Sequence, residues 1–400
     1  MHIVKHSLLL LVAITLAGCS TSQARTDRDS LPRPPASHDS TQAPLTLEQM
    51  FAQDDFDLPH ALLLFSRENA AEFFGAGEQG PELALWHDRF EKYTDELKRS
   101  LRRDTSPRQR LLTLIEFVHA KLGLRFDPAD PRGYSPENLF FDRVITRRAG
   151  YCVTLSLAYI VFGQAAGLNV TAVRMPGHFA VKYVDDQGPE KLITLVESTR
   201  QGALLDELEV WSKYRFSVQS VEAGCYLTPL TDKQIFSVLY NNLAGVTHLA
   251  GNDTRALERY DYSLRLWPFQ PEPLYNRALI QRNLGMSQPA LRDLNAAIRI
   301  DPNFTHALLA RAGVLFEAGE TQAARNDLSL ALRQRPDWPE PHLLDATLAA
   351  SEGRFDDARA AFMRALERDP DNKAAHAGLA PIERALGNEE AARKHEAAAR

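Results

Sequence analysis

Small apolar residues recur at a fixed interval along residues 244–392. Two series of alanines keep a spacing of thirty-four residues, and so do one series of glycines and one of prolines: Ala244, Ala278, Ala312, Ala346, Ala380; Ala256, Ala290, Ala324, Ala358, Ala392; Gly251, Gly285, Gly319, Gly353, Gly387; Pro268, Pro302, Pro336, Pro370. Alanine lets two antiparallel helices approach closely, glycine supplies a turn, and proline ends a helix. The spacing therefore predicts stacked helix pairs over residues 231–400, with repeats that begin near residues 237, 271, 305, 339 and 373.

A thirty-four-residue period with these residue types resembles the tetratricopeptide repeat. Thr231 and Gln234 form a capping box that is expected to open the first helix, and the polar end of the chain suits a solvated cap. The resemblance implies protein or peptide partners, bound in the concave groove of the array. Five residues fall at repeat positions that usually line such a groove: Asn241, Tyr275, Arg282, His306 and Phe316.

Helical and extended segments alternate in the region before the repeats. Ser-Pro pairs at Ser106 and Ser135 place an N-cap before a proline in the first helical turn. The pattern predicts helices over residues 107–122, 136–145 and 154–164, then strands over 170–174, 179–184 and 192–196, the last two joined by a turn at 185–188. Residues 45–105 are expected to form further helical pieces. The fold expected for residues 106–230 is therefore α+β.

The N-terminus resembles a secretory signal peptide. Lys5 precedes an apolar run from Leu8 to Leu16, which is too short to span a bilayer. The sequence Leu16-Ala-Gly-Cys19 resembles the lipobox of bacterial lipoproteins, which implies cleavage before Cys19 and attachment of the chain to a membrane through lipid on Cys19. The alternative is an ordinary signal peptide (residues 1–18) with an incidental cysteine.

The residues after Cys19 indicate where the anchored protein would lie. Lipoproteins kept in the inner membrane usually have Asp after the lipidated cysteine, whereas Ser20 follows here, so the resemblance implies the outer membrane, facing the periplasm. Residues 19–44 are rich in Ser, Thr and Pro and predict a flexible tether. The 46 basic and 52 acidic residues form no long run of one sign, which gives no reason to expect nucleic-acid binding.

Cys152 is the candidate nucleophile. It stands at the start of an apolar helix, where amide N–H groups and the helix dipole favour a thiolate. If Val184 pairs with Lys191 across the turn, His178 faces Glu197, and a carboxylate can then orient the imidazole. These are the parts of a thiol nucleophile system.

Two simpler interpretations of Cys152 remain open. It can be a small buried hydrophobic residue. It can also form a disulfide with Cys225, the other cysteine that remains once Cys19 is lipidated. His60, His87 and His119 lack partners at metal-ligand spacing, so no metal or organic cofactor is expected.

Residues 138–202 resemble the bacterial branch of the transglutaminase-like superfamily. The resemblance rests on Arg147-Arg-Ala-Gly-Tyr-Cys152-Val-Thr-Leu-Ser, Pro176-Gly-His178-Phe-Ala-Val and Val196-Glu197-Ser-Thr. It implies a papain-like domain in which Cys152 is the nucleophile, His178 the general base and acid, and Glu197 the partner that orients the ring. This chain has Glu197-Ser-Thr where many members have Asp-Pro-Thr, and it lacks their Trp after the histidine.

Asn138 is a weaker candidate, because the superfamily often places an amide side chain upstream of the nucleophile to polarise the oxyanion. The alternative role for Asn138 is at the start of a helix. The resemblances together imply an α+β transglutaminase-like domain followed by an all-α tetratricopeptide solenoid. The expected function is thiol-dependent hydrolysis or acyl transfer at amide or isopeptide bonds of proteins or peptides, with the repeats as adaptor; the alternative is a non-catalytic scaffold that binds envelope partners.

Overall fold

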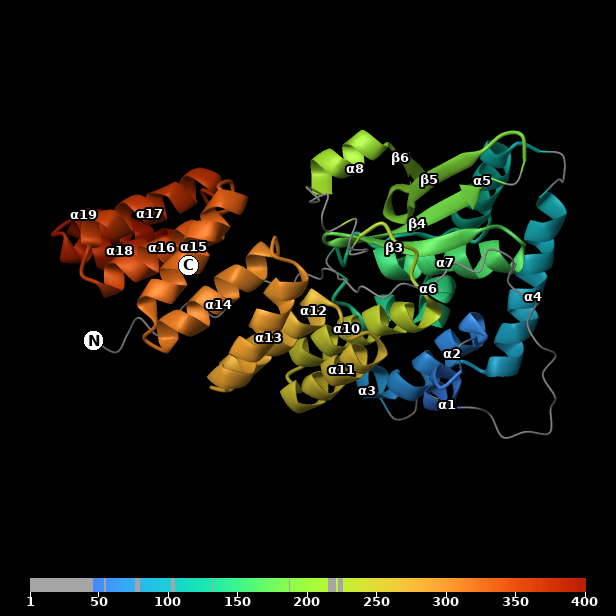
Figure 1. Cartoon of the computed structure of the whole chain (residues 1–400), viewed down its shortest axis with the longest axis horizontal. Coiled ribbons are helices and arrows are strands. Elements are labelled where there is room, and N and C mark those ends of the chain that lie inside the picture. The colour runs from blue at the N-terminus through green and yellow to red at the C-terminus, as the bar shows by residue number, and fades with distance from the viewer. Residues whose placement is uncertain are drawn as a thin grey trace. The chain divides into compact units, whose positions relative to one another are not determined.

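A computed structural model describes residues 46–53, 55–75, 80–101, 105–131, 133–186, 188–214, 221 and 226–400. These residues form two compact units, which meet in the sequence between Phe269 and Gln270 (Figure 1). Cys19, the expected signal peptide and tether, and Cys225 lie outside the described residues.

The first unit begins with four helices. They are α1 (Leu47–Phe51), α2 (Leu58–Asn69), α3 (Ala71–Phe74) and α4 (Leu83–Ser100). Thr46 and Asp57 cap α1 and α2 by accepting hydrogen bonds from backbone amides of the first turn. The helical pieces expected in this region are present.

Three helices follow, and the last carries Cys152. They are α5 (Pro107–Glu116), which continues as a π-helical turn over Phe117–Lys121, then α6 (Phe141–Arg147) and α7 (Cys152–Ala165). Ser106 caps α5 as predicted, since its side chain accepts a hydrogen bond from the amide of Gln109. The second Ser-Pro pair opens only a 3-10 turn at Pro136–Asn138, ahead of α6. Nearly every residue of α7 is buried, which explains its apolar sequence.

Four antiparallel strands form the main sheet in the order β3-β4-β5-β6. They are β3 (Val170–Met175), β4 (His178–Asp185), β5 (Leu192–Glu197) and β6 (Ala203–Leu205), while β1 (Arg125–Phe126) and β2 (Ala149–Gly150) form a separate parallel pair. Figure 1 shows α7 on one side of the main sheet and α8 (Glu207–Tyr214) on the other. Because side chains alternate along a strand, β3 and β4 send one set to α7 and the other set, including Val173 and Ala180, toward Val210 of α8.

The expected register between β4 and β5 was wrong by two residues. Val184 pairs with Ile193 and not with Lys191, because the connection lies one residue later than expected: Asp185 pairs with Leu192, so it covers residues 186–191 instead of 185–190. A shift of two residues keeps every side chain on its original face, since the period of a strand is two. Glu197 is therefore on the expected face, two residues along the chain from the position opposite His178.

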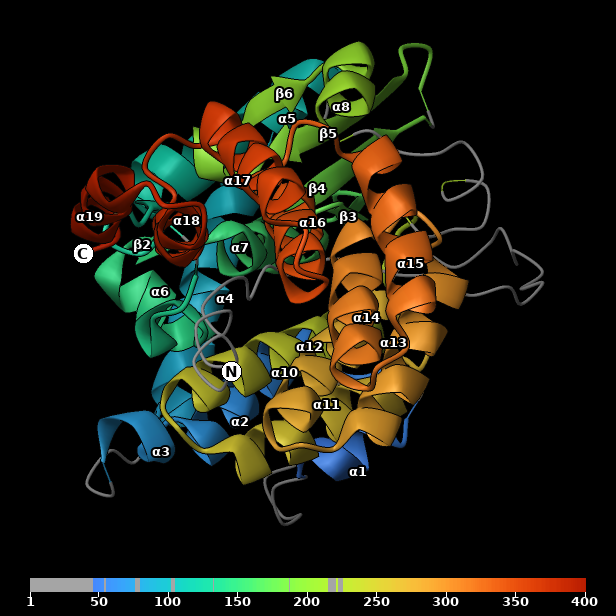
Figure 2. The same cartoon turned by 90° about the vertical axis from the view of Figure 1, so that its left-hand side faces the viewer.

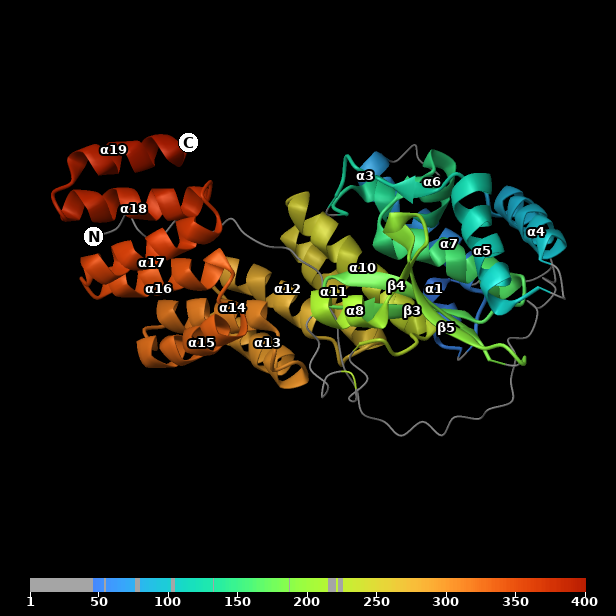
Figure 3. The same cartoon turned by 90° about the horizontal axis from the view of Figure 1, so that it is seen from above.

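Helices α10 (Asp232–Leu249) and α11 (Asp253–Leu266) belong to the first compact unit, which continues past the expected boundary at residue 230. Thr231 and Gln234 form the predicted capping box at the start of α10. Phe236 and Leu239 are fully buried in the same core as Leu47 and Phe65 of the N-terminal helices. The two helices are seen side by side in Figure 3.

Arg259 of α11 forms hydrogen bonds with residues of α2 and α3, near the start of the first unit. Its guanidinium donates to both carboxylate oxygens of Glu72, at 3.0 and 2.6 Å, and to Asn69 at 3.2 Å. The Arg259 side chain is only 4% exposed, so the pair is buried on the arginine side, where losing one partner would leave an uncompensated charge.

The second unit, residues 270–400, consists of four helix pairs (Figure 2). They are α12 (Pro271–Asn283) with α13 (Ser287–Ile300), α14 (Thr305–Glu317) with α15 (Thr321–Gln334), α16 (Pro339–Ser351) with α17 (Phe355–Arg368), and α18 (Lys373–Ala385) with α19 (Glu389–Ala398). The first helices of the pairs begin at the predicted residues 271, 305, 339 and 373. The periodic alanines are buried, and Gly285, Gly319 and Gly353 have φ between 75° and 83°, which L side chains rarely adopt.

None of the helices within the described ranges is both long enough and apolar enough to cross a bilayer.

Candidate functional site

Cys152 is the first residue of α7, and it forms no disulfide bond in the part of the chain that the structure describes. The residue before it, Tyr151, is extended, so the chain enters the helix directly at the cysteine. Thr154 fixes this first turn, because its hydroxyl donates to the carbonyl of Asn138 at 3.0 Å. The first amides of a helix have no partner within it, so N–H groups gather around the start of α7, beside the thiol.

His178 opens β4 and contacts both other candidate residues. Its Nε2 lies 2.5 Å from Oε2 of Glu197, and the Cys152 side chain is near enough to the imidazole to help raise its pKa. Because Nε2 is engaged by the carboxylate, Nδ1 is the ring nitrogen left for the thiol. The structure thus brings Cys152, His178 and Glu197 together from a helix and two strands.

The neighbours of His178 hold its ring in the charged form. Burial by itself would lower the pKa of His178, but hydrogen bonds and charge attraction to Cys152 and Glu197 outweigh it and raise the pKa to about 9. An imidazole with this pKa is protonated at neutral pH, which is the form that stabilises a neighbouring thiolate.

Glu197, the last residue of β5, is only 1% exposed and uses both carboxylate oxygens. Oε2 binds His178, while Oε1 accepts from the amide of Thr199 at 3.2 Å and from its hydroxyl at 2.7 Å. Burial favours the neutral acid, but His178 and these two donors outweigh it and lower the pKa of Glu197. A charged carboxylate with both oxygens fixed cannot turn away from the imidazole.

Two serines that the sequence analysis did not single out join the helix to the strand end. The Ser198 hydroxyl lies 3.0 Å from the Ser156 hydroxyl and donates to the carbonyl of Cys152 at 3.3 Å. Both serines are buried. Ser156, a buried hydroxyl one turn after Cys152 in a mostly apolar helix, was the available sequence signal.

Tyr214 covers the imidazole and was also missed. Its ring stacks on His178 with 6.0 Å between centroids and 10° between planes. Burial, and then the nearby charges of Glu197 and Cys152, raise the pKa of Tyr214, so its ring stays neutral. The ring comes from the end of α8, a helix that no sequence pattern predicted.

Asn138 does not have the role that the resemblance implied. Its amide nitrogen donates to Asp127 at 3.1 Å and to Asp130 at 2.8 Å, and its carbonyl oxygen accepts from Arg147 at 3.1 Å. Both amide hydrogens are therefore occupied, and the residue is fully buried. Asn138 holds the loop before α6 and has no donor left for an oxyanion.

The expected groove residues divide into buried and accessible ones. Asn241 and Tyr275 are 5% and 4% exposed, because each packs inside its own unit. Arg282 is 21% exposed and forms a bidentate pair with Glu317, and Phe316 is half-buried. His306 lies among aromatic rings, 4.6 Å from that of Trp338, and burial followed by the charge of Arg335 lowers its pKa to about 4.

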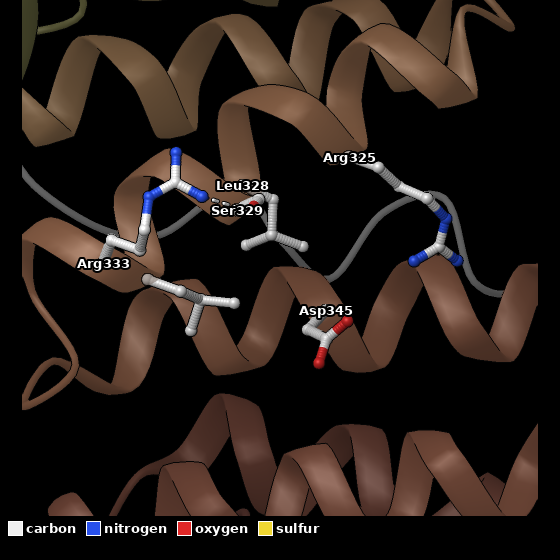
Figure 4. A pocket seen from close by; sticks show the side chains of 6 residues that line it. Arg325, Leu328, Ser329, Arg333 and Asp345 are labelled. Atoms are coloured by element: carbon white, nitrogen blue, oxygen red, sulfur yellow. Dashed lines mark hydrogen bonds between the residues drawn. The ribbon is translucent and has the colours of Figure 1, made fainter.

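A hollow of about 340 Å³ lies on the repeats between α15 and α16 (Figure 4). It lies where the repeat pattern changes. Arg277 and Arg311 bind Asp293 and Asp327 in successive repeats, but the next equivalents of Arg311 and Asp327 are Asp345 and Ala361, so this ion pair does not recur. The hollow is lined by Arg325, Leu328, Ser329, Leu332, Arg333 and Asp345. Arg325 is held by Glu352, and Asp345 by Arg364.

Within the described ranges, no three His, Cys, Asp or Glu side chains gather in a way that could hold a metal ion. His60 and His87 do approach each other, with 3.0 Å between Nδ1 of His60 and Nε2 of His87.

Comparison with known proteins separates the same two parts of the chain. The Transglutaminase-like superfamily model matches residues 85–241, and two Tetratricopeptide repeat models match residues 271–304 and 349–395. A UPF0162 protein of Xylella fastidiosa strain Temecula1 is 29% identical over 166 residues, 40% of this chain. The matched part spans 58% of the length of that relative.

Solved structures of repeat proteins also resemble the chain. One is TTC0263, a thermophilic TPR protein of Thermus thermophilus, with 24% identity, coverage of 41% of this chain and 89% of that one, and a TM-score of 0.38. Another is MamA of Desulfovibrio magneticus RS-1, with 22% identity, coverage of 42% and 93%, and a TM-score of 0.35. By its matched family models, this chain carries a transglutaminase-like superfamily domain followed by tetratricopeptide repeats.

Proposed function

We propose that the protein is a thiol enzyme that breaks or transfers acyl groups at amide or isopeptide bonds of proteins or peptides. The observation that carries this proposal is the 2.5 Å contact between His178 Nε2 and Glu197 Oε2, with Cys152 at the start of α7 beside the same imidazole. A thiol, a base and an orienting acid are what nucleophilic catalysis at a carbonyl requires.

In the first half of the proposed reaction, Cys152 becomes acylated. Its thiol proton resides on His178, and the sulfur attacks the carbonyl carbon of the amide to form a C–S bond. His178 then gives its proton to the leaving nitrogen as the C–N bond breaks, which yields a thioester and a free amine. Glu197 keeps the ring in place and stabilises its charged form throughout.

In the second half, the acyl group leaves the enzyme. His178 takes a proton from the incoming water or amine as its oxygen or nitrogen attacks the thioester. The C–S bond breaks, and the sulfur leaves with the electron pair of that bond. Water is the default acceptor, so hydrolysis is the favoured outcome. Since Asn138 has no spare donor, the backbone N–H groups of the first turn of α7 are the proposed donors to the oxyanion.

The proposal extends to the location of the enzyme and the role of its repeats. Lipid on Cys19 would hold it at the outer membrane, facing the periplasm, where envelope proteins and peptides are available as substrates. The tetratricopeptide repeats suggest protein or peptide binding, and we propose that they bring the substrate or a partner to the enzyme.

The test compares peptides from the cell envelope of three strains: wild type, a Cys152→Ala strain and a strain that lacks the chain. The proposal predicts that peptides accumulate or disappear in the Cys152→Ala strain as they do in the deletion strain, because one sulfur atom carries the chemistry. A Cys152→Ala profile equal to wild type, alongside a changed deletion profile, would contradict the proposal and favour a non-catalytic scaffold.

A further inference from the structure

A buried hydrogen bond joins the first helix of the repeat region to the residue before the nucleophile. The side-chain nitrogen of Asn242, in α10, donates to the hydroxyl oxygen of Tyr151 at 2.6 Å. Both residues are 7% exposed. Tyr151 is the N-cap residue of α7, so this bond reaches the backbone from which Cys152 projects.

The preceding residue fixes the orientation of the Asn242 amide. Asn241 donates from its side-chain nitrogen to Oδ1 of Asn242 at 3.2 Å. With that oxygen engaged, the nitrogen of Asn242 is the end that faces Tyr151. Asn241, which the sequence suggested as a groove residue, therefore belongs to a chain of hydrogen bonds that runs through Asn242 to Tyr151, the residue before Cys152.

Backbone packing confines the Tyr151 ring on another side. A Cβ atom placed on Gly133 would lie 2.5 Å from Cδ2 of Tyr151, closer than such atoms can approach, so the ring rests directly on the glycine. Gly133 has a φ of 71°, which also favours glycine there. The ring is thus held by the loop through Gly133 and at its hydroxyl by α10.

Burial and the neighbouring charge of Cys152 raise the pKa of Tyr151, which keeps the hydroxyl neutral. A neutral buried hydroxyl that loses its donor leaves an unsatisfied oxygen, which disfavours the present ring position. Loss of the Asn242 side chain would therefore shift Tyr151 and alter the backbone at the start of α7.

We infer that Asn242 is a positioning residue that acts through Tyr151 to hold the Cys152 sulfur at the start of α7 and within reach of His178. On this account, one residue of the first helix of the repeat region helps to position the nucleophile. The inference rests on the proposed function of Cys152.

The test measures how fast iodoacetamide alkylates Cys152 in the full-length chain, read from the Cys152 peptide by mass spectrometry. The readout is the ratio of the rate at pH 7 to the rate at pH 10, where an ordinary thiol is ionised. An activated thiol keeps most of its rate at pH 7, whereas an ordinary one loses most of it. A variant that is less stable but remains folded at both pH values, as checked by circular dichroism, keeps this ratio.

Asn242→Ala is the informative variant, and Ser237→Ala is its matched control. Ser237 is a buried residue of the same helix whose hydroxyl bonds to Ser263 within the helix pair. We expect Asn242→Ala to lower the ratio about three- to tenfold, the size expected for one lost hydrogen bond. Ser237→Ala is expected to leave it unchanged.

Tyr151→Phe removes the acceptor and keeps the ring, so it provides the same test if Asn242→Ala folds poorly. The double variant is expected to behave like either single variant, because both remove one interaction. A wild-type ratio as low as that of a simple thiol would overturn the proposed function itself. A high wild-type ratio that both Asn242→Ala and Tyr151→Phe leave intact would overturn the positioning role alone.

Discussion

The length of the Glu197 side chain matters for the geometry of the site. In the observed register, Glu197 is diagonal to His178 rather than opposite it, and its carboxylate still reaches Nε2 at 2.5 Å. Diagonal neighbours on one face of an antiparallel pair are farther apart than direct ones, so a longer acid is suited to this contact. The glutamate at position 197, where many members of the superfamily have aspartate, is therefore compatible with the contact to His178.

Replacing the acid by its amide should change the pH profile. Glu197 helps to raise the pKa of His178 to about 9, so Glu197→Gln is expected to lower that pKa. Turnover requires protonated His178 to release the leaving amine, so the alkaline limb of the profile, near pH 9 in wild type, should move to lower pH. The measurement is the initial rate of peptide hydrolysis against pH. Glu190→Gln, an exposed glutamate in the β4–β5 connection, is the control and should leave the limb in place.

The sequence predicted Cys152, His178 and Glu197 as a set, and the structure brings them together. The prediction of the set was correct although the predicted register was not. In a hairpin, the register decides which face of the sheet a side chain is on, and a shift of two residues leaves that face unchanged. Ser198, Tyr214 and Asn242 were not predicted, because their contacts with the site join elements far apart in the chain and follow no local period. Asn138 was predicted to polarise the oxyanion by analogy with the superfamily, but its side-chain amide is hydrogen-bonded to Asp127, Asp130 and Arg147.

Helix α10 serves both the helix pair it forms with α11 and the core of the first unit. The thirty-four-residue period correctly predicted repeats from residue 271 onward, since the small residues and turns repeat with it. The same period could not reveal that α10 also packs on α1 and α2, because those partners are distant in sequence and use irregularly spaced apolar residues. Its capping box was nevertheless predicted correctly.

A matched pair of leucines on α10 tests this packing. Leu239 is fully buried in the first unit, whereas Leu249, at the end of the same helix, is 54% exposed. Leu239→Ala should reduce the free energy of unfolding by about 2–5 kcal/mol, and Leu249→Ala by less than about 0.5 kcal/mol. Urea denaturation of both variants measures the difference. Equal losses would contradict a shared core.

Truncation gives a coarser test at the same scale. A chain that ends at residue 230 lacks Phe236 and the other apolar side chains of α10, so we expect it to lose cooperative thermal unfolding. A chain that ends at Phe269 keeps both helices of the first unit and should still unfold in one cooperative transition, as followed by circular dichroism. A cooperative transition for the shorter chain would show that α10 is dispensable.

The whole molecule, as proposed, is a tethered enzyme with an adaptor for its substrates. Cys19→Ala should abolish incorporation of labelled palmitate and release the chain into the soluble periplasmic fraction, because the lipid is the proposed anchor. The measurement is metabolic labelling followed by fractionation. Cys225→Ser is the control, and its labelling should equal that of wild type. Persistent membrane association of an unlabelled Cys19→Ala chain would contradict the lipid anchor.

We propose that His178 activates the sulfur of Cys152, and this activation can be measured as the rate of Cys152 alkylation at pH 7. The wild-type thiol should react at least about tenfold faster than the thiol of a His178→Ala variant, because the variant lacks the imidazolium beside the sulfur. Equal and slow reaction of Cys152 in the two proteins would contradict it.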